Sequence, residues 1–257
     1  MHRRTRLAAL AIALTTSACS AAGNGALPLR VEVVETYPHD PAAFTQGLLV
    51  DDKGRLLEST GRYNSSDVRV VDVATGAVLD RTPLPGQFFG EGLAQVGNRL
   101  VQITWQERKA LVFDAATLDL LSVTFDYDTE GWGLCHDGTR LVMSDGSSTL
   151  TFRAPDTFER TGSIGVTLGG TALDQLNELE CAGGKVYANV WQTDTIVEID
   201  PETGRVTAEI DASGLLSSEE RAETDVLNGI AKIPDKDTFY ITGKLWPKLF
   251  EVRFVPR

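Results

Sequence analysis

Glu91-Gly92-Leu93 is one of five related phrases in this chain. The other four are Gln46-Gly47-Leu48, Trp132-Gly133-Leu134, Asn177-Glu178-Leu179 and Asn228-Gly229-Ile230. Neighbouring phrases lie about 45 residues apart, which is the length of one four-stranded blade of a β-propeller. A second anchor stands at the same offset in all five copies, at Thr60, Trp105, Gly146, Trp191 and Thr242. The repeat therefore predicts a propeller.

Between the phrases, apolar and polar residues alternate as they do in β-strands. Leu100–Trp105, Arg140–Ser144 and Thr195–Ile199 are three of the predicted strands. Turn signals such as Asp72 to Gly76 lead into a fourth strand of each copy. One helix is predicted at Ser217–Thr224, because its first residue and Glu220 have the spacing of a capping box.

The two ends of the chain predict how the ring closes. The fifth copy stops at Arg257 after its third strand, whereas the alternating run Leu29–Glu35 precedes the first copy and belongs to none. Placed beside the last blade, this run covers an edge that would otherwise be exposed. A β-sandwich is the alternative. Five copies of one unit favour a single all-β domain over residues 29–257, a five-bladed β-propeller closed by its N-terminal strand.

Residues 1–18 are expected to form a signal peptide. A basic start precedes the apolar run Leu7–Leu14, which is too short to span a bilayer. Small residues then lead to Cys19, and two outcomes stay open: acylation of this cysteine, as in a bacterial lipoprotein, and ordinary cleavage between Ala18 and Ala22. Either outcome predicts a secreted or periplasmic protein, with residues 19–28 as a tether.

The charge of the chain limits its partners. The formal net charge is −12, and removal of the signal peptide makes it more negative because that segment carries arginines and no acidic residue. Phosphate backbones and anionic headgroups repel such a chain. We therefore expect no nucleic-acid partner and no direct membrane contact apart from a lipid on Cys19. We also expect a monomer.

Cysteine and histidine are scarce. With Cys19 set aside, Cys135 and Cys181 remain in an oxidising compartment, which permits one disulfide; two separate buried thiols are the alternative. Alignment of the third and fourth copies turns these two cysteines toward each other across neighbouring blades, which favours the disulfide. Only His39 and His136 remain after cleavage, too few for a three-histidine zinc site. We expect no catalytic metal and no cofactor, and a structural calcium stays open.

The innermost strands of a propeller line its channel, so equivalent positions of the copies form rings around the axis. The two anchors and their surroundings bring together Gln46, Glu91, Trp105, Trp132, Asn177, Trp191, Asn228 and Lys244. Because the residue differs from copy to copy, we interpret these positions as a site rather than as packing between blades.

Glu91 is the expected chemical centre of this site. Phe88 and Phe89 precede it, and burial among aromatic side chains raises the pKa of a carboxyl, which can then take and return protons near neutrality. Neutral amides and indole N–H groups can polarise a carbonyl beside it. The alternative is that Glu91 is a hydrogen-bonded polar residue of the channel with no chemical role.

Seven longer stretches carry a family resemblance. They are Ala43-Phe44-Thr45-Gln46-Gly47-Leu48, Phe89-Gly90-Glu91-Gly92-Leu93, Glu130-Gly131-Trp132-Gly133-Leu134, Met143-Ser144-Asp145-Gly146-Ser147, Leu176-Asn177-Glu178-Leu179-Glu180, Leu227-Asn228-Gly229-Ile230-Ala231 and Thr242-Gly243-Lys244-Leu245-Trp246-Pro247. The chain resembles the plant-type glutaminyl-peptide cyclotransferases, which also occur in bacteria, from about Val33 to Val252. It departs from them locally at Arg153-Ala154-Pro155, on an outer hairpin.

The resemblance implies a metal-independent acyltransferase on a five-bladed propeller, which converts N-terminal glutamine of peptides or proteins to pyroglutamate and releases ammonia. Glu91 would take a proton from the α-ammonium and return one to the departing ammonia. Asn177 and Lys244 would hold or polarise the γ-amide oxygen. The substrate pocket would consist of Phe44, Gln46, Phe89, Trp105, Trp132 and Trp191.

Two other functions stay open at this point. One is a non-catalytic propeller that binds a partner at the channel mouth, because a fold alone does not specify function. The other is a lactonase-type hydrolase. Such an enzyme holds a divalent ion through several carboxylates, whereas the rings supply only Glu91 and Glu178.

Overall fold

The computed structural model describes residues 25–257, which are almost entirely β-structure. Three sheets have four strands each. They are β2 (Thr45–Val50), β3 (Leu56–Thr60), β4 (Asp67–Val71) and β5 (Val78–Pro83); β6 (Gly90–Val96), β7 (Arg99–Thr104), β8 (Lys109–Asp114) and β9 (Leu120–Asp126); and β10 (Leu134–His136), β11 (Leu141–Met143), β12 (Thr149–Arg153) and β13 (Arg160–Gly165).

The remaining strands form one eight-stranded sheet and a small hairpin. In spatial order the large sheet contains β16 (Leu176–Ala182), β17 (Lys185–Val190), β18 (Thr195–Ile199), β19 (Val206–Asp211), β1 (Leu27–Pro38), β22 (Lys248–Pro256), β21 (Phe239–Gly243) and β20 (Leu227–Lys232). The hairpin pairs β14 (Thr167–Leu168) with β15 (Thr171–Ala172).

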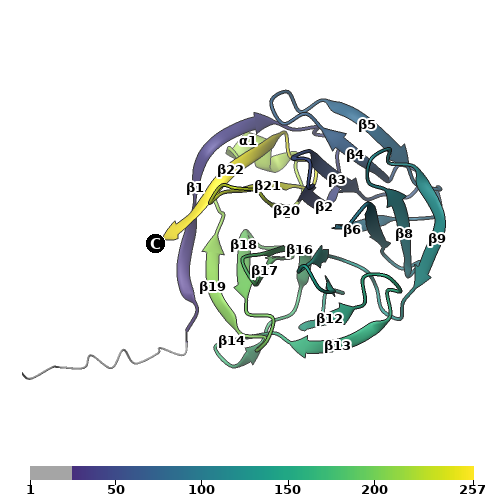
Figure 1. Cartoon of the computed structure of the whole chain (residues 1–257). Coiled ribbons are helices and arrows are strands. Elements are labelled where there is room, and N and C mark those ends of the chain that lie inside the picture. Colours follow the sequence, from purple (N-terminus) through teal and green to yellow (C-terminus); the bar gives the residue numbers. More distant parts are fainter. Residues whose placement is uncertain (1–24) are drawn as a thin grey trace, which may run out of the picture.

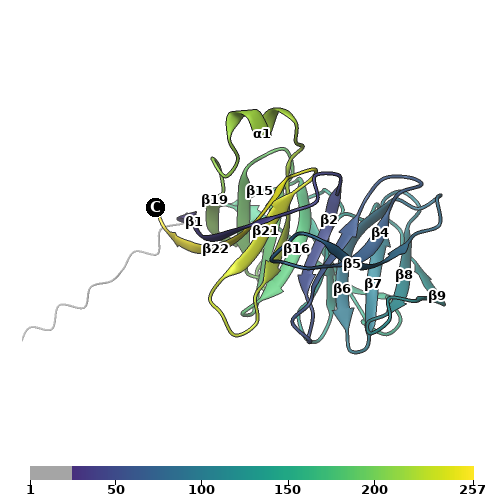
Figure 2. The same cartoon turned by 90° about the horizontal axis from the view of Figure 1, so that it is seen from above.

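The sheets surround a common centre (Figure 1), and Figure 2 shows them with the view turned by 90°. Their first strands contact one another in a circle: β2 contacts β6, β6 contacts β10, β10 contacts β16, β16 contacts β20, and β20 contacts β2. The inner strands therefore close a ring. This arrangement is a propeller-like all-β fold with the innermost strands around the axis.

The N-terminal strand joins the two ends of the chain. β1 pairs antiparallel with β22, from Leu29 opposite Pro256 to Pro38 opposite Lys248. The first residues of β1 also pair in parallel with β19. In Figure 1 the purple β1 accordingly runs along the outside of the yellow β22 and continues to β19. The expected pairing of the N-terminal strand with the last strand of the chain is confirmed.

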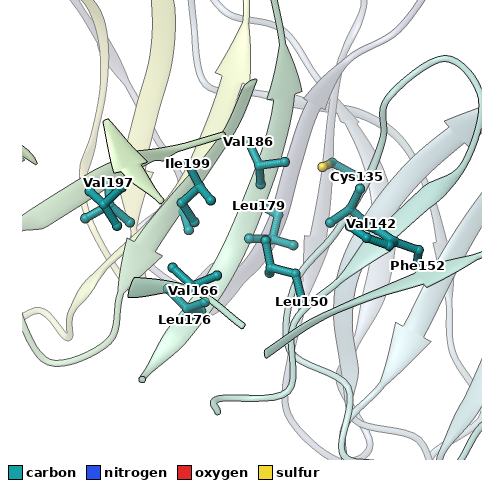
Figure 3. Close-up of a cluster of buried hydrophobic side chains, with 12 residues drawn as sticks. Cys135, Val142, Leu150, Phe152, Val166, Leu176, Leu179, Val186, Val197 and Ile199 are labelled. Atoms are coloured by element: carbon teal, nitrogen blue, oxygen red, sulfur yellow. The ribbon is translucent and has the colours of Figure 1, made fainter. Parts of the chain in front are cut away.

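Apolar side chains fill the space between neighbouring sheets. Figure 3 shows one such cluster, in which Val142 and Leu150 of one sheet face Leu179 and Val186 of the next. Full burial of one such side chain contributes about 1.5–3 kcal/mol. Each sheet is covered on both faces by its neighbours, so most residues of its inner three strands are buried. The outer strands β5, β9 and β13 are largely exposed.

A disulfide joins Cys135 of β10 to Cys181 of β16, with the two Cα atoms 5.5 Å apart. The predicted disulfide is therefore confirmed, and the alternative of two separate thiols is wrong. Cys135 belongs to the apolar cluster of Figure 3, and Cys181 packs against it. The bond thus crosslinks two neighbouring sheets through a core that is already buried.

Most local predictions agree with the structure. The helix is α1 (Ser218–Ala222), capped by Ser217 with both hydrogen bonds of the capping box. The predicted strand Thr195–Ile199 is β18 itself. The third sheet differs, since the strand predicted at Arg140–Ser144 is only Leu141–Met143. The strand ends at Met143, while the Ser144 backbone still bonds Gly133 and Trp132 and its hydroxyl bonds the backbone of Gly133 and Asn177.

Within residues 25–257 the structure has no helix with both the length and the apolar character of a membrane span. The predicted signal peptide and the cysteine at position 19 lie outside the described residues.

Candidate active site

A cavity of about 140 Å³ opens where the inner strands meet. Its lining consists of Gln46, Phe89, Glu91, Trp105, Trp132, Asn177, Trp191 and Lys244. All eight are residues that the sequence predicted for the site. The volume is below the usual range for pockets that bind extended small molecules and suits a single side chain.

A β-bulge lies at four of the five phrases, and in three of them its residue, Gln46, Glu91 or Asn177, lines the cavity. The register of the first hairpin shifts between Thr45 and Gly47, and the second shifts between Gly90 and Leu93. The hairpins that begin with Leu176 and Leu227 shift at the same place. A bulge leaves one residue outside the ladder and redirects its side chain. In these four copies the repeated phrase is therefore the sequence of the bulge.

Close packing between neighbouring inner strands explains the glycine at the centre of the phrase. A Cβ on Gly92 would collide with the backbone of Gly133 and Leu134, and one on Gly133 would collide with the Asn177 carbonyl. Neighbouring inner strands approach this closely only where they converge on the axis. Glycine at this position thus allows the ring of inner strands to be narrow.

Glu91, on β6, is the buried carboxyl of the cavity, with 4% of its surface exposed. Gln46 Nε2 donates to its Oε1 over 3.0 Å. Burial raises the pKa of Glu91 well above its ordinary value; the charge of Lys244 opposes this, and the charges of Glu130 and Glu107 add to it. The carboxyl is thus suited to exchange protons near neutral pH.

Lys244 and Asn177 bring polar groups to the same cavity. Burial lowers the pKa of Lys244, although the charges of Glu91 and Asp225 favour its ammonium form. Its Nζ lies 5.0 Å from the centre of the Phe44 ring, a cation–π contact. Asn177 Oδ1 is buried without a hydrogen-bond partner among the described residues. A ligand that supplies polar atoms would therefore satisfy groups that the fold leaves unpaired.

Aromatic side chains form the walls. Phe89 packs edge-on against Trp105 with ring centres 5.6 Å apart, and Trp132 packs edge-on against Trp191 at 5.5 Å. Phe44, also predicted as a pocket residue, packs edge-on against Phe89 with ring centres 6.2 Å apart but does not line the cavity. The walls are therefore apolar while the polar groups lie on β2, β6, β16 and the loop after β21.

Two members of the predicted rings serve the fold instead of the cavity. Asn228 donates to Gln46 Oε1 over 3.2 Å, and so orients the amide that donates to Glu91. Glu178 accepts the backbone N–H groups of Leu48 and Ile230, and thereby bridges three inner strands across the axis. Trp246, the fourth tryptophan, is fully buried, and its indole N–H bonds the Asp225 carbonyl.

The sequence reasoning missed the acidic rim of the cavity. Glu130 accepts hydrogen bonds from the indole N–H groups of Trp105 and Trp132. Glu107 accepts from the Tyr63 hydroxyl and from the backbone N–H of Phe89. Glu130 stands two residues before Trp132 in the third phrase, but the second phrase has Phe89 at the equivalent position. The repeat alone therefore gave no reason to select it.

The arrangement can bind a small side chain between aromatic walls, polarise a carbonyl with a cation and an amide, and move a proton at one carboxyl. Across residues 25–257, no three His, Cys, Asp or Glu side chains group closely enough to hold a metal ion. A propeller-like all-β fold with such a cavity at its axis defines a class of enzyme that acts on a small, partly apolar group.

The comparisons with known proteins specify this class further. The sequence model of the glutamine cyclotransferase family matches residues 6–254, and the chain belongs to that family. It is 43% identical over 227 residues to the glutaminyl-peptide cyclotransferase of Arabidopsis thaliana, covering 87% of this chain and 71% of the plant protein. It also matches the crystal structure of the glutaminyl cyclase of Myxococcus xanthus with a TM-score of 0.82 and 39% identity, covering 90% of this chain and 99% of that one.

Proposed function

We propose that this protein is a glutaminyl-peptide cyclotransferase, which converts the N-terminal glutamine of peptides or proteins to pyroglutamate. The observation that carries the proposal is Glu91, a buried carboxyl with a raised pKa inside a cavity the size of one side chain. Membership of the family and the names of its relatives support the same reaction.

In the proposed reaction the α-amine attacks the γ-amide carbon of the same residue. A bond forms between the α-nitrogen and that carbon, the bond from the carbon to the amide nitrogen breaks, and ammonia leaves. Glu91 takes a proton from the α-ammonium and delivers one to the departing nitrogen. The Lys244 ammonium and the Asn177 amide stabilise the negative charge on the γ-oxygen.

The aromatic walls supply orientation. Both reacting groups belong to one residue, so the main requirement is a curled conformer held without competing water. Phe89, Trp105, Trp132 and Trp191 enclose such a conformer, and Phe44 packs against Phe89. Gln46, oriented by Asn228, keeps the Glu91 carboxyl in place.

We also propose that the ring is a five-bladed propeller. The circle of contacts between β2, β6, β10, β16 and β20 supports one blade for each inner strand. The eight-stranded sheet then counts as two blades joined at their outer edges by β1.

The location and state of the protein are proposals as well. The sequence of residues 1–18 supports export to the periplasm or the medium, with anchoring through a lipid on Cys19 or release by ordinary cleavage. A disulfide between Cys135 and Cys181 supports an oxidising compartment. The acidic chain supports a monomer that acts on peptides without nucleic acid.

The test is an ammonia-release assay on a short peptide that begins with glutamine, with product mass as the second readout. The same peptide with an acetylated N-terminus is the matched control, because it keeps the γ-amide but has no nucleophile. We expect only the free peptide to release ammonia. Its mass should fall by about 17 units, the mass of NH₃, because the attack expels the amide nitrogen. Binding of the peptide without release would favour a non-catalytic partner-binding protein.

A further inference from the structure

Glu130 holds two walls of the cavity at once. Its Oε2 accepts the indole N–H of Trp105 over 2.8 Å and that of Trp132 over 3.1 Å, while Oε1 accepts Gln106 Nε2 over 3.3 Å. Trp105 follows β7 and Trp132 precedes β10, so the carboxylate connects two neighbouring sheets at the channel mouth. No other described side chain bonds either indole.

The two indoles in turn set the positions of the other aromatic residues. Trp105 packs edge-on against Phe89, and Trp132 packs edge-on against Trp191. An indole is free to rotate about its side-chain bonds unless packing or a hydrogen bond at its N–H fixes it. One carboxylate therefore fixes the orientation of the whole aromatic wall.

We propose that Glu130 is a positioning residue of this site: its carboxylate fixes Trp105 and Trp132 in the orientation that encloses the substrate side chain. The proposal rests on the proposed function for its kinetic consequences, but the orientation of the indoles is independent of it. Glu130 need not touch the substrate. It acts through the tryptophans, and its loss leaves both indole N–H groups without this acceptor.

The charge of Glu130 has a second effect. Burial acts to raise the pKa of Glu130, but its hydrogen bonds from Trp132, Trp105 and Gln106 outweigh burial, and its pKa is lowered. Glu130 is therefore ionised at neutral pH and adds to the raised pKa of Glu91. The groups facing either carboxyl are Lys244, Glu107, Arg108, Tyr63 and Tyr127.

Two variants separate hydrogen bonding from charge. Glu130→Ala removes every acceptor, and we expect kcat/KM to fall on the order of a hundredfold, mostly in kcat, because the curled conformer is no longer enclosed. Glu130→Gln keeps one acceptor oxygen and nearly the same volume, and we expect a loss of about tenfold as a charge-assisted hydrogen bond becomes a neutral one. In the Gln variant the acid limb of kcat/KM moves to lower pH.

Glu107→Gln is the matched control. It removes a negative charge from the same rim but breaks no hydrogen bond to an indole, because Glu107 bonds the Tyr63 hydroxyl and the Phe89 backbone. It should move the acid limb in the same direction while leaving the tryptophan bands of the near-ultraviolet circular dichroism spectrum unchanged. Glu130→Ala should weaken those bands, because three of the four tryptophans line the cavity.

The spectrum requires no substrate, so it tests the positioning even if the wild-type protein releases no ammonia, which would refute the proposed function alone. Tryptophan bands that match the wild type in Glu130→Ala overturn the positioning role, whether or not activity falls. If Glu130→Ala does not fold, the same comparison is made with Glu130→Gln, in which unchanged bands and a kcat/KM within about twofold overturn it.

Discussion

Replacement of Glu91 by glutamine should lower activity and not lower stability. Glutamine keeps the volume of the side chain and an oxygen that accepts the hydrogen bond from Gln46. It cannot exchange a proton, and a positioned acid–base group contributes about 10²–10⁴ in rate. We therefore expect kcat to fall by at least about a hundredfold, which is roughly 3 kcal/mol in activation free energy.

The stability expectation follows from the same burial. The pKa of Glu91 is raised in the folded protein, so folding binds a proton that the unfolded chain has lost. The Glu91 carboxyl therefore lowers the free energy of unfolding as the pH rises above the ordinary pKa of a glutamate, and this loss is largest above the raised pKa of the folded protein. Glu91→Gln removes this cost, and its free energy of unfolding should match or exceed that of the wild type at pH 8.

Two measurements decide the matter. Ammonia release from a glutamine-initiated peptide gives kcat, and urea unfolding at pH 5 and pH 8 gives stability for both proteins. The advantage of the variant should be larger at pH 8 than at pH 5. Activity within tenfold of the wild type in a folded variant would refute the role of Glu91, and a clear loss of stability at pH 8 would refute the reasoning about burial.

Three further outcomes are expected. Ammonia release should persist in EDTA, because each proton step is assigned to protein side chains; loss in chelator and recovery with zinc would contradict this mechanism. The double variant Cys135→Ala and Cys181→Ala should have a free energy of unfolding about 4 kcal/mol lower, because the disulfide closes a loop with a sequence separation of 46. Urea unfolding measures this difference, and a loss under about 1 kcal/mol would contradict the expectation. Burial acts to lower the pKa of His39, but the charge and hydrogen bond of Glu58 outweigh burial, and the net pKa of His39 is raised. The His39–Glu58 pair therefore stabilises the fold at pH 6 and loses part of this effect as His39 deprotonates at higher pH. The stability deficit of His39→Gln, roughly 3 kcal/mol, should therefore shrink between pH 6 and pH 9, and a deficit that grows would contradict the assignment.

The repeat made much of the fold predictable. Each copy carries a local signal, and the offset between the phrase and its second anchor locates the inner hairpin in all five copies. The spare strand before the first copy and the missing strand after the last predicted the pairing of β1 with β22. The length of β11 was not predictable, because Ser144 bonds the irregular segment before β10 and the Asn177 carbonyl of β16, contacts that exist only in the folded ring.

The site was predictable where the phrase itself supplies a side chain, as with Glu91 and Asn177. Phe44 was assigned to the pocket by resemblance, yet it does not line the cavity and instead contacts two residues that do, Phe89 and Lys244. Glu130 was missed for a different reason. Its importance comes from which indoles it bonds, and a hydrogen bond between two copies leaves no periodic signal.

The pairing of β1 with β22 has a consequence for how the chain reaches its folded state. The sheets from β2 to β13 consist of hairpins, each of which forms between residues that are close in sequence. β1 must wait for a partner at the opposite terminus, where Leu29 meets Pro256. Contacts between such distant residues form slowly, and until they form two strands remain as open edges on which other chains can pair. The first strand to be synthesised is therefore the last to be secured, and completion of the ring depends on the nine residues of β22.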